Sequence, residues 1–94
     1  MGRGPAYLVS VRHITDGGLD SIDELLARVR DIDGLTEKKR GVFYRESKAF
    51  LHFHEDGNDV YADCRLDGAE FDRMRVTTGA EQRKLVAAIR KAVQ

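Results

Sequence analysis

The period of the hydrophobic pattern changes twice along this chain, and this change limits the fold more than any other feature. Residues 21–34 carry apolar side chains at helical spacing, residues 41–66 alternate with a period of two, and residues 78–93 return to helical spacing. The pattern therefore predicts two helices on either side of an antiparallel meander.

Both predicted helices begin with a capping motif. Ser21 is followed three residues later by Glu24, and Thr78 is followed three residues later by Glu81. Gly34 is placed to end the first helix. The apolar stripe of the first helix is Ile22, Leu25, Leu26, Val29 and Ile32, and that of the second is Leu85, Ala88, Ile89, Ala92 and Val93.

The alternating segment divides into three strands, at residues 41–45, 49–54 and 60–66. A two-residue turn centred on Asp56-Gly57 is the strongest hairpin signal, because such turns need positive φ angles. On the core face, this turn would place Phe53 opposite Val60, Leu51 opposite Ala62 and Ala49 opposite Cys64. On the other face, it would place His54 opposite Asp59, His52 opposite Tyr61 and Phe50 opposite Asp63.

Three further features complete the predicted sheet. A turn at Glu46-Ser47 would place Val42 opposite Leu51 and Tyr44 opposite Ala49, with all four on the core face. Residues 71–77 predict a fourth strand with a bulge, and residues 6–12, which follow Gly4-Pro5, predict an N-terminal strand. The residues from Thr15 to Gly18 predict a loop.

The expected fold is an α+β two-layer sandwich, with an antiparallel sheet of four to five strands and both helices on one sheet face. With 94 residues, the chain fits a single domain at 1–94. The sequence contains no apolar run near the roughly 20 residues that span a membrane, and the lone Cys64 does not suit a disulfide-stapled secreted domain. We therefore expect a cytoplasmic protein with no membrane partner.

Motifs for catalysis are absent from the sequence. It contains no G-x-S-x-G, no glycine-rich phosphate loop and no H-E-x-x-H. Cys64 alternates onto the predicted core face, which favours a small buried side chain over a reactive thiolate. We expect a non-enzymatic protein without a cofactor.

The sheet face opposite the helices is expected to carry aromatic and histidine side chains. Its residues are Phe43, Phe50, His52, His54 and Tyr61, a set unusual for a solvated sheet face. Either the N-terminal strand or loop or a second copy of the chain would cover Phe43, Phe50 and Tyr61. The leading interpretation is a binding face that contacts a second copy of the chain, another protein or a nucleic acid.

Charge patterning supports self-association. The formal net charge is zero, yet residues 37–54 carry five positive and two negative charges, residues 55–72 carry one positive and seven negative, and residues 73–94 carry six positive and one negative. Opposite patches on one small domain favour intramolecular pairing or a homo-oligomer over attraction to a polyanion.

A second interpretation of the same face is a metal site. His52 and His54 lie two residues apart on one strand, so both imidazoles leave the same face, and Asp59 and Asp63 would lie across from them. Two imidazoles with a carboxylate form a ligand set for zinc or ferrous iron, which makes His52, His54 and Asp63 the candidate ligands. His13, after the first strand, is a candidate third ligand or base.

A third interpretation is weak nucleic-acid binding. Phe43 and Phe50 would act as stacking platforms, and the phosphate partners would be Lys38-Lys39-Arg40, Arg45 and Lys48. Zero net charge restricts this interpretation to the turn around Arg45 and Lys48.

The stretch from Gly41 to His54 resembles the centre of the small bacterial MmcQ/YjbR-type domains. The resemblance follows the order of elements over residues 21–93, and by residue type it covers Lys48-Ala49-Phe50. It implies a CyaY-like α+β sandwich and a DNA-binding role. It implies no catalytic residues. The histidine-rich strand and the extra N-terminal strand depart from the pattern of that family.

Overall fold

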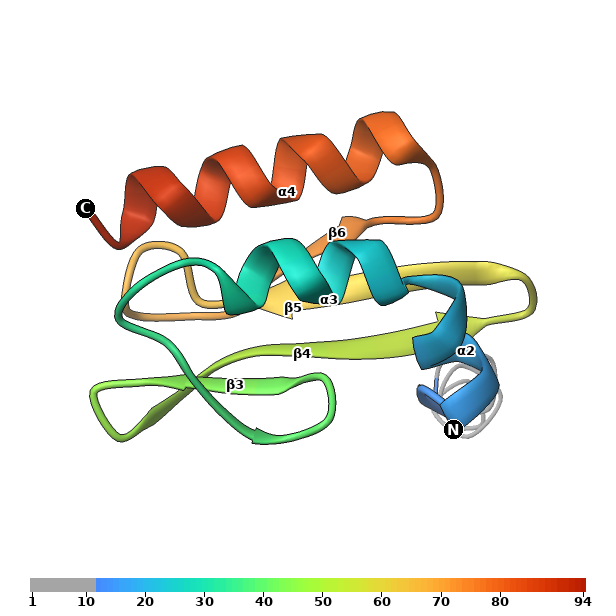
Figure 1. The fold of residues 1–94 in the computed structure, drawn as a ribbon, viewed down its shortest axis with the longest axis horizontal. Helices are drawn as coiled ribbons and strands as arrows, with labels where there is room; N and C mark the ends of the chain where they lie inside the picture. Colours follow the sequence, from blue (N-terminus) through green and yellow to red (C-terminus); the bar gives the residue numbers. More distant parts are fainter. Residues whose placement is uncertain (1–11) are drawn as a thin grey trace, which may run out of the picture.

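A computed structural model describes residues 12–94 of the chain. Its elements are β1 (Arg12–His13), α2 (Asp16–Ser21), α3 (Asp23–Arg30), β2 (Thr36–Lys39), β3 (Val42–Arg45), β4 (Lys48–Asp56), β5 (Asp59–Cys64), β6 (Asp72–Arg75) and α4 (Gly79–Ala92) (Figure 1). No helix among these residues is long and apolar enough to cross a membrane.

The strands form one antiparallel sheet in the order β2-β3-β4-β5-β6. The short strand β1 pairs with the far end of β4, beyond the part that pairs with β3. Most of the N-terminal strand expected at residues 6–12 lies outside the described residues. The predicted fourth strand is confirmed as β6, and the α+β two-layer fold is confirmed.

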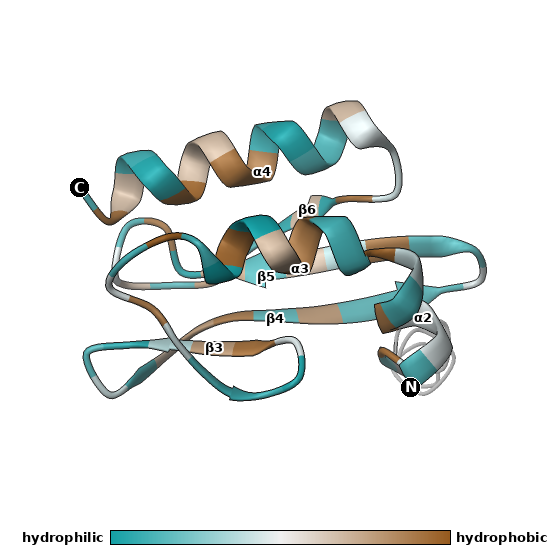
Figure 2. Ribbon diagram, viewed as in Figure 1, coloured by the Kyte–Doolittle hydropathy of each residue, from teal (hydrophilic) through white to brown (hydrophobic). Residues whose placement is uncertain are grey.

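Helices α3 and α4 cover one face of this sheet (Figure 1). Their apolar side chains meet those of β4 and β5 in a single core, in which Leu26, Leu51 and Ile89 have no exposed surface. Burying each such side chain contributes about 1.5–3 kcal/mol. Both helices carry hydrophobic and hydrophilic stretches along their length (Figure 2), as the helical spacing of their apolar residues predicted.

One predicted helix start is confirmed and the other is wrong. The Thr78 hydroxyl accepts from the backbone N–H of Glu81, and the Glu81 carboxylate accepts from the backbone N–H of Thr78. Ser21, however, ends α2, and its hydroxyl donates to the carbonyl of Gly18. The expected loop at 15–18 instead begins α2, because the Thr15 side chain caps this helix by accepting from the Gly18 N–H.

The predicted register of the β4–β5 hairpin is wrong by two residues. Asp56 pairs with Asp59, so the turn consists of Gly57 and Asn58. Gly57 has a φ of 62°, the positive angle that primed turns require at their first central position. Leu51 consequently lies opposite Cys64, and His52 lies opposite Asp63. A shift of two residues preserves the alternation of faces in the paired residues 51–56 and 59–64, and Cys64 is buried as expected.

The expected exposure of Phe43 and Phe50 is also wrong. Tyr44 pairs with Ala49 as predicted, but Phe43 rather than Val42 pairs with Leu51, so β4 has a bulge at Phe50. The bulge turns Phe43 toward the helices and brings Phe50 and its neighbour Leu51 into the core together. Phe43 is 1% exposed and Phe50 is 2% exposed.

The edge strand β2 was not predicted. Its sequence, Thr36-Glu37-Lys38-Lys39, has no alternation of apolar residues, and three of its four residues are exposed. Charged side chains are typical of sheet edges, where they discourage pairing with other chains.

Candidate metal centre

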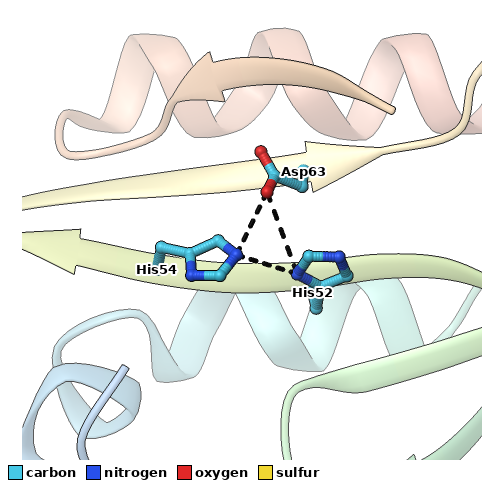
Figure 3. A group of neighbouring side chains, drawn as sticks. All are labelled: His52, His54 and Asp63. Carbon is cyan, nitrogen blue, oxygen red and sulfur yellow. Dashed lines mark hydrogen bonds and ion pairs between the residues drawn. The ribbon is translucent and has the colours of Figure 1, made fainter. Parts of the chain in front are cut away.

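The sheet face away from the helices carries a cluster of His52, His54 and Asp63 (Figure 3). The two histidines lie on β4 and point to the same side because they are two residues apart. Asp63 lies on β5 directly opposite His52. In Figure 3 the helices lie behind the strands, and the three side chains converge in front of them.

One atom from each side chain faces a common point. Nδ1 of His52 lies 3.1 Å from Nε2 of His54, and the same Nε2 lies 3.0 Å from Oδ2 of Asp63. The third separation, between Nδ1 of His52 and Oδ2 of Asp63, is 4.0 Å. The side chains of Asp63 and His54 are mostly buried, at 11% and 14% exposed, and that of His52 is 30% exposed.

Arg73 on β6 holds the carboxylate in place. Its Nε donates to Oδ1 of Asp63 at 2.7 Å, and its Nη2 donates to Oδ2 at 2.8 Å. Burial raises the pKa of the Asp63 carboxyl, but the hydrogen bonds and charge of Arg73 outweigh burial, helped by His54 and His52. The pKa of Asp63 consequently lies below its ordinary value of 3.8, and the carboxylate is ionised at neutral pH.

His52 is neutral at the same pH. Burial lowers its pKa below the ordinary value of 6.5, although the nearby Asp63 charge acts to raise it. Phe71 packs edge-on against His52, with the ring centres 4.9 Å apart, and the guanidinium of Arg65 lies 4.2 Å from the centre of the Phe71 ring. Phe71 is 37% exposed, so it forms part of the surface beside the cluster.

The structure brings only some of the predicted site residues together. Tyr61 is half-buried and pairs with His54, which places it on the same face. Asp59 lies away from the cluster, because its carboxylate accepts from Arg75 and from the Thr77 hydroxyl.

The residues proposed for nucleic-acid contact do not form a stacking surface. Phe43 and Phe50, the expected platforms, are core residues. Arg45 is half-buried, and its Nη1 donates to the carbonyl of Ala92 at the end of α4. Lys48 is exposed and pairs with Arg45 at the start of β4. The described structure therefore offers no aromatic support for nucleic-acid binding at this turn.

Sequence reasoning missed Arg73 and Phe71. The signal for Arg73 was present, because Arg73 and Arg75 alternate with Met74 and Val76 along the predicted fourth strand. The register of that strand was open, so no partner could be assigned to Arg73. In the structure Asp63 pairs with Arg73, and Tyr61 pairs with Arg75.

Pairing between the acidic middle of the chain and its basic C-terminal part is present within one molecule. Arg73 binds Asp63, and Arg75 binds Asp59. This outcome agrees with one of the two predictions from the charge pattern, namely that oppositely charged segments pair within one molecule. The homo-oligomer, the protein or nucleic-acid partner and the absence of enzymatic activity stay predictions.

Comparisons with protein-family models, with curated proteins and with solved structures found no match to this chain. The resemblance to MmcQ/YjbR-type domains accordingly stays a prediction, and the function is argued from the site itself.

Proposed function

We propose that this chain binds a divalent transition-metal ion through His52, His54 and Asp63. The observation that carries the proposal is the convergence of Nδ1, Nε2 and Oδ2 at separations of 3.1, 3.0 and 4.0 Å. Three atoms so spaced lie on a circle with a radius of about 2.0 Å, which is the usual distance from zinc to an imidazole nitrogen or a carboxylate oxygen.

Hydrogen bonds among these three side chains do not satisfy all three of the converging atoms. Nε2 of His54 lies at almost equal distances from Oδ2 of Asp63, which only accepts, and from Nδ1 of His52, which donates or accepts according to its tautomer. A neutral imidazole nitrogen carries at most one hydrogen, so it cannot donate fully to both. A single cation between the three atoms would interact favourably with all of them.

The charges of the site support the same conclusion. A metal ligand must be deprotonated, and the lowered pKa values of Asp63 and His52 keep the first anionic and the second neutral at pH 7. Arg73 fixes the orientation of the carboxylate, as partners outside the coordination shell do in many metal sites. Two imidazoles and one carboxylate suit zinc and ferrous iron, and zinc is the simpler probe because it has no redox chemistry.

The test is calorimetric titration of the full chain with zinc at pH 7.5. We expect saturable binding of one ion per chain and a rise in melting temperature. Zinc at a hundredfold excess over its Kd would add about 2.7 kcal/mol to the free energy of unfolding. The variants His52→Ala, His54→Ala and Asp63→Asn should each lose most of this stabilisation.

The control is Glu24→Gln, which removes an exposed carboxylate from α3, in the helix layer on the other side of the sheet. It should bind zinc like the natural sequence. Affinity should fall as the pH drops through the lowered pKa of His52, because a proton then competes with the metal ion for this imidazole. No saturable binding, or binding that is unchanged in a His52→Ala/His54→Ala double variant, would overturn the proposal.

A further inference from the structure

A third histidine lies beside the cluster. His13 is in β1, and the register of β1 with β4 places it directly opposite His54. Directly paired residues of antiparallel strands present their side chains on the same face. His13 therefore shares the face of His52, His54 and Asp63, although it precedes the two histidines by about forty positions and the aspartate by fifty in the sequence.

The position of the His13 ring suits a further metal ligand. Its centre lies 5.4 Å from that of His54, close to the 4.9 Å that separates the rings of His52 and His54. The planes of His13 and His54 are tilted by 30°. Because His13 is exposed, its ring can rotate about the side-chain bonds without displacing packed neighbours.

A pocket of about 630 Å³ is shared by His13 and one member of the cluster, His52. It runs along the edge of β4, and its lining includes both His13 and His52, together with residues of α2 and β3. The ring of His13 thus contacts His54, and His13 also shares a solvent-filled space with His52. The ligand atoms that converge in this structure are those of His52, His54 and Asp63, so the exposed His13 ring has to turn about its side-chain bonds to bind a cation held there.

We infer that His13 is the fourth protein ligand of the proposed metal ion, which makes the site a closed set of three imidazoles and one carboxylate. Zinc in structural sites takes four protein ligands in a tetrahedron, and His52, His54 and Asp63 supply three of them. The ion then joins β1 to β4 and β5. This inference rests on the proposed metal site and adds the ligand that fastens β1 to the sheet.

The test compares His13→Ala with the natural chain in the same zinc titration. Loss of the His13 imidazole should raise the Kd for zinc about 10- to 100-fold. A loss of this size follows even when only a hydrogen-bond partner of a metal ligand is removed. Without metal, the melting temperature of His13→Ala should equal that of the natural chain, because His13 is exposed. The control is Lys39→Ala, which alters the lining of the same pocket without removing a ligand and should not weaken zinc binding.

Two further measurements distinguish a His13 that binds the metal ion from a His13 that only lies beside it. In a chain with 15N-labelled histidine, zinc should shift the imidazole nitrogen resonances of all three histidines. With cobalt as the probe, the natural chain should give the strong visible absorption of a tetrahedral ion, and His13→Ala should lose part of that intensity.

The outcomes distinguish the two proposals. If His13→Ala binds zinc like the natural chain while His52→Ala does not, the inference about His13 is overturned and the metal site stands. If neither variant changes binding, the metal site at His52 is itself overturned.

Discussion

The guanidinium of Arg73 donates two hydrogen bonds to the carboxylate of Asp63, at 2.7 and 2.8 Å, across the neighbouring strands β6 and β5. The carboxylate belongs to a residue that is 8% exposed, so water does not replace these bonds easily. A buried charge is tolerated when it is paired in this way. Arg73 therefore makes an acidic group compatible with this part of the sheet.

Arg73→Gln should destabilise the protein even without a metal ion. Removing the guanidinium leaves the mostly buried Asp63 carboxylate with its desolvation cost, which amounts to about 1–3 kcal/mol. For a domain of this size, each kcal/mol lowers the melting temperature by roughly 4–8 °C. Thermal unfolding followed by circular dichroism measures the change.

The control for this prediction is Lys84→Gln, on an exposed position of α4. The double variant Arg73→Gln/Asp63→Asn should be less destabilised than the sum of the two single changes, because the residues are in direct contact. Additive losses would show that the pair is energetically independent.

Gly41 and Gly57 should respond differently to alanine. Both have positive φ angles, 81° and 62°, which costs an alanine about 1–2 kcal/mol. A Cβ at position 57 meets nothing within 4 Å, whereas a Cβ at position 41 would lie 2.7 Å from Cδ2 of the buried Leu19. Gly41→Ala should therefore lose about 1–3 kcal/mol more than Gly57→Ala because of overpacking. Urea denaturation of both variants tests this, and equal losses would contradict it.

Glu37 should make stability depend on pH. Its carboxylate accepts from Arg30 at 2.6 and 3.0 Å and from the backbone N–H of Gly41 at 2.9 Å. The hydrogen bond from Arg30 outweighs burial and holds the pKa of Glu37 below its ordinary value of 4.5. A carboxyl group whose pKa is lower in the folded state than in the unfolded state stabilises the protein at pH values above its pKa in the unfolded state. This stabilisation is lost as the pH falls through the pKa of the group in the folded state.

Glu37→Gln should consequently cost about 0.5–1 kcal/mol at pH 7, since the pair is partly exposed. The difference from the natural chain should be constant well above pH 4.5 and shrink as the pH falls from 4.5 through the lowered pKa of Glu37. Urea denaturation at several pH values measures it, with Glu24→Gln as the control. A difference that is the same at pH 3 and pH 7 would exclude this role for Glu37.

The thiol of Cys64 should be unreactive in the folded protein. Burial raises its pKa to about 12, and the nearby Asp72 charge adds to the effect. Disulfide reagents react with the thiolate, which is therefore scarce at pH 8. Labelling with a chromogenic disulfide should be slow in buffer and complete in denaturing urea. Rapid labelling in buffer would show that β5 opens locally.

Local patterns were sufficient for much of this fold. The change of hydrophobic period predicted α3, α4 and strands β3 to β5. Side chains return to the same face every three to four residues in a helix and every two residues in a strand. The capping box at Thr78 and the shared face of His52 and His54 follow from the same short spacings. The two elements that were missed, α2 and β2, lack those signals. One contains two glycines, and the other is a polar edge strand.

The sequence by itself determined which side chains share a face, and only the tertiary structure decided which of them meet. A shift of two residues between β4 and β5 preserves the alternating pattern, so alternation alone does not distinguish the register that places Asp63 opposite His52 from the one that does not. The turn at Gly57 and the packing of the core choose between them. The bulge at Phe50, and the positions of Arg73 and His13 beside the site, likewise depend on contacts between segments that are distant in the sequence. The histidine pair was therefore visible in the sequence, whereas the complete candidate site exists only in the folded sheet.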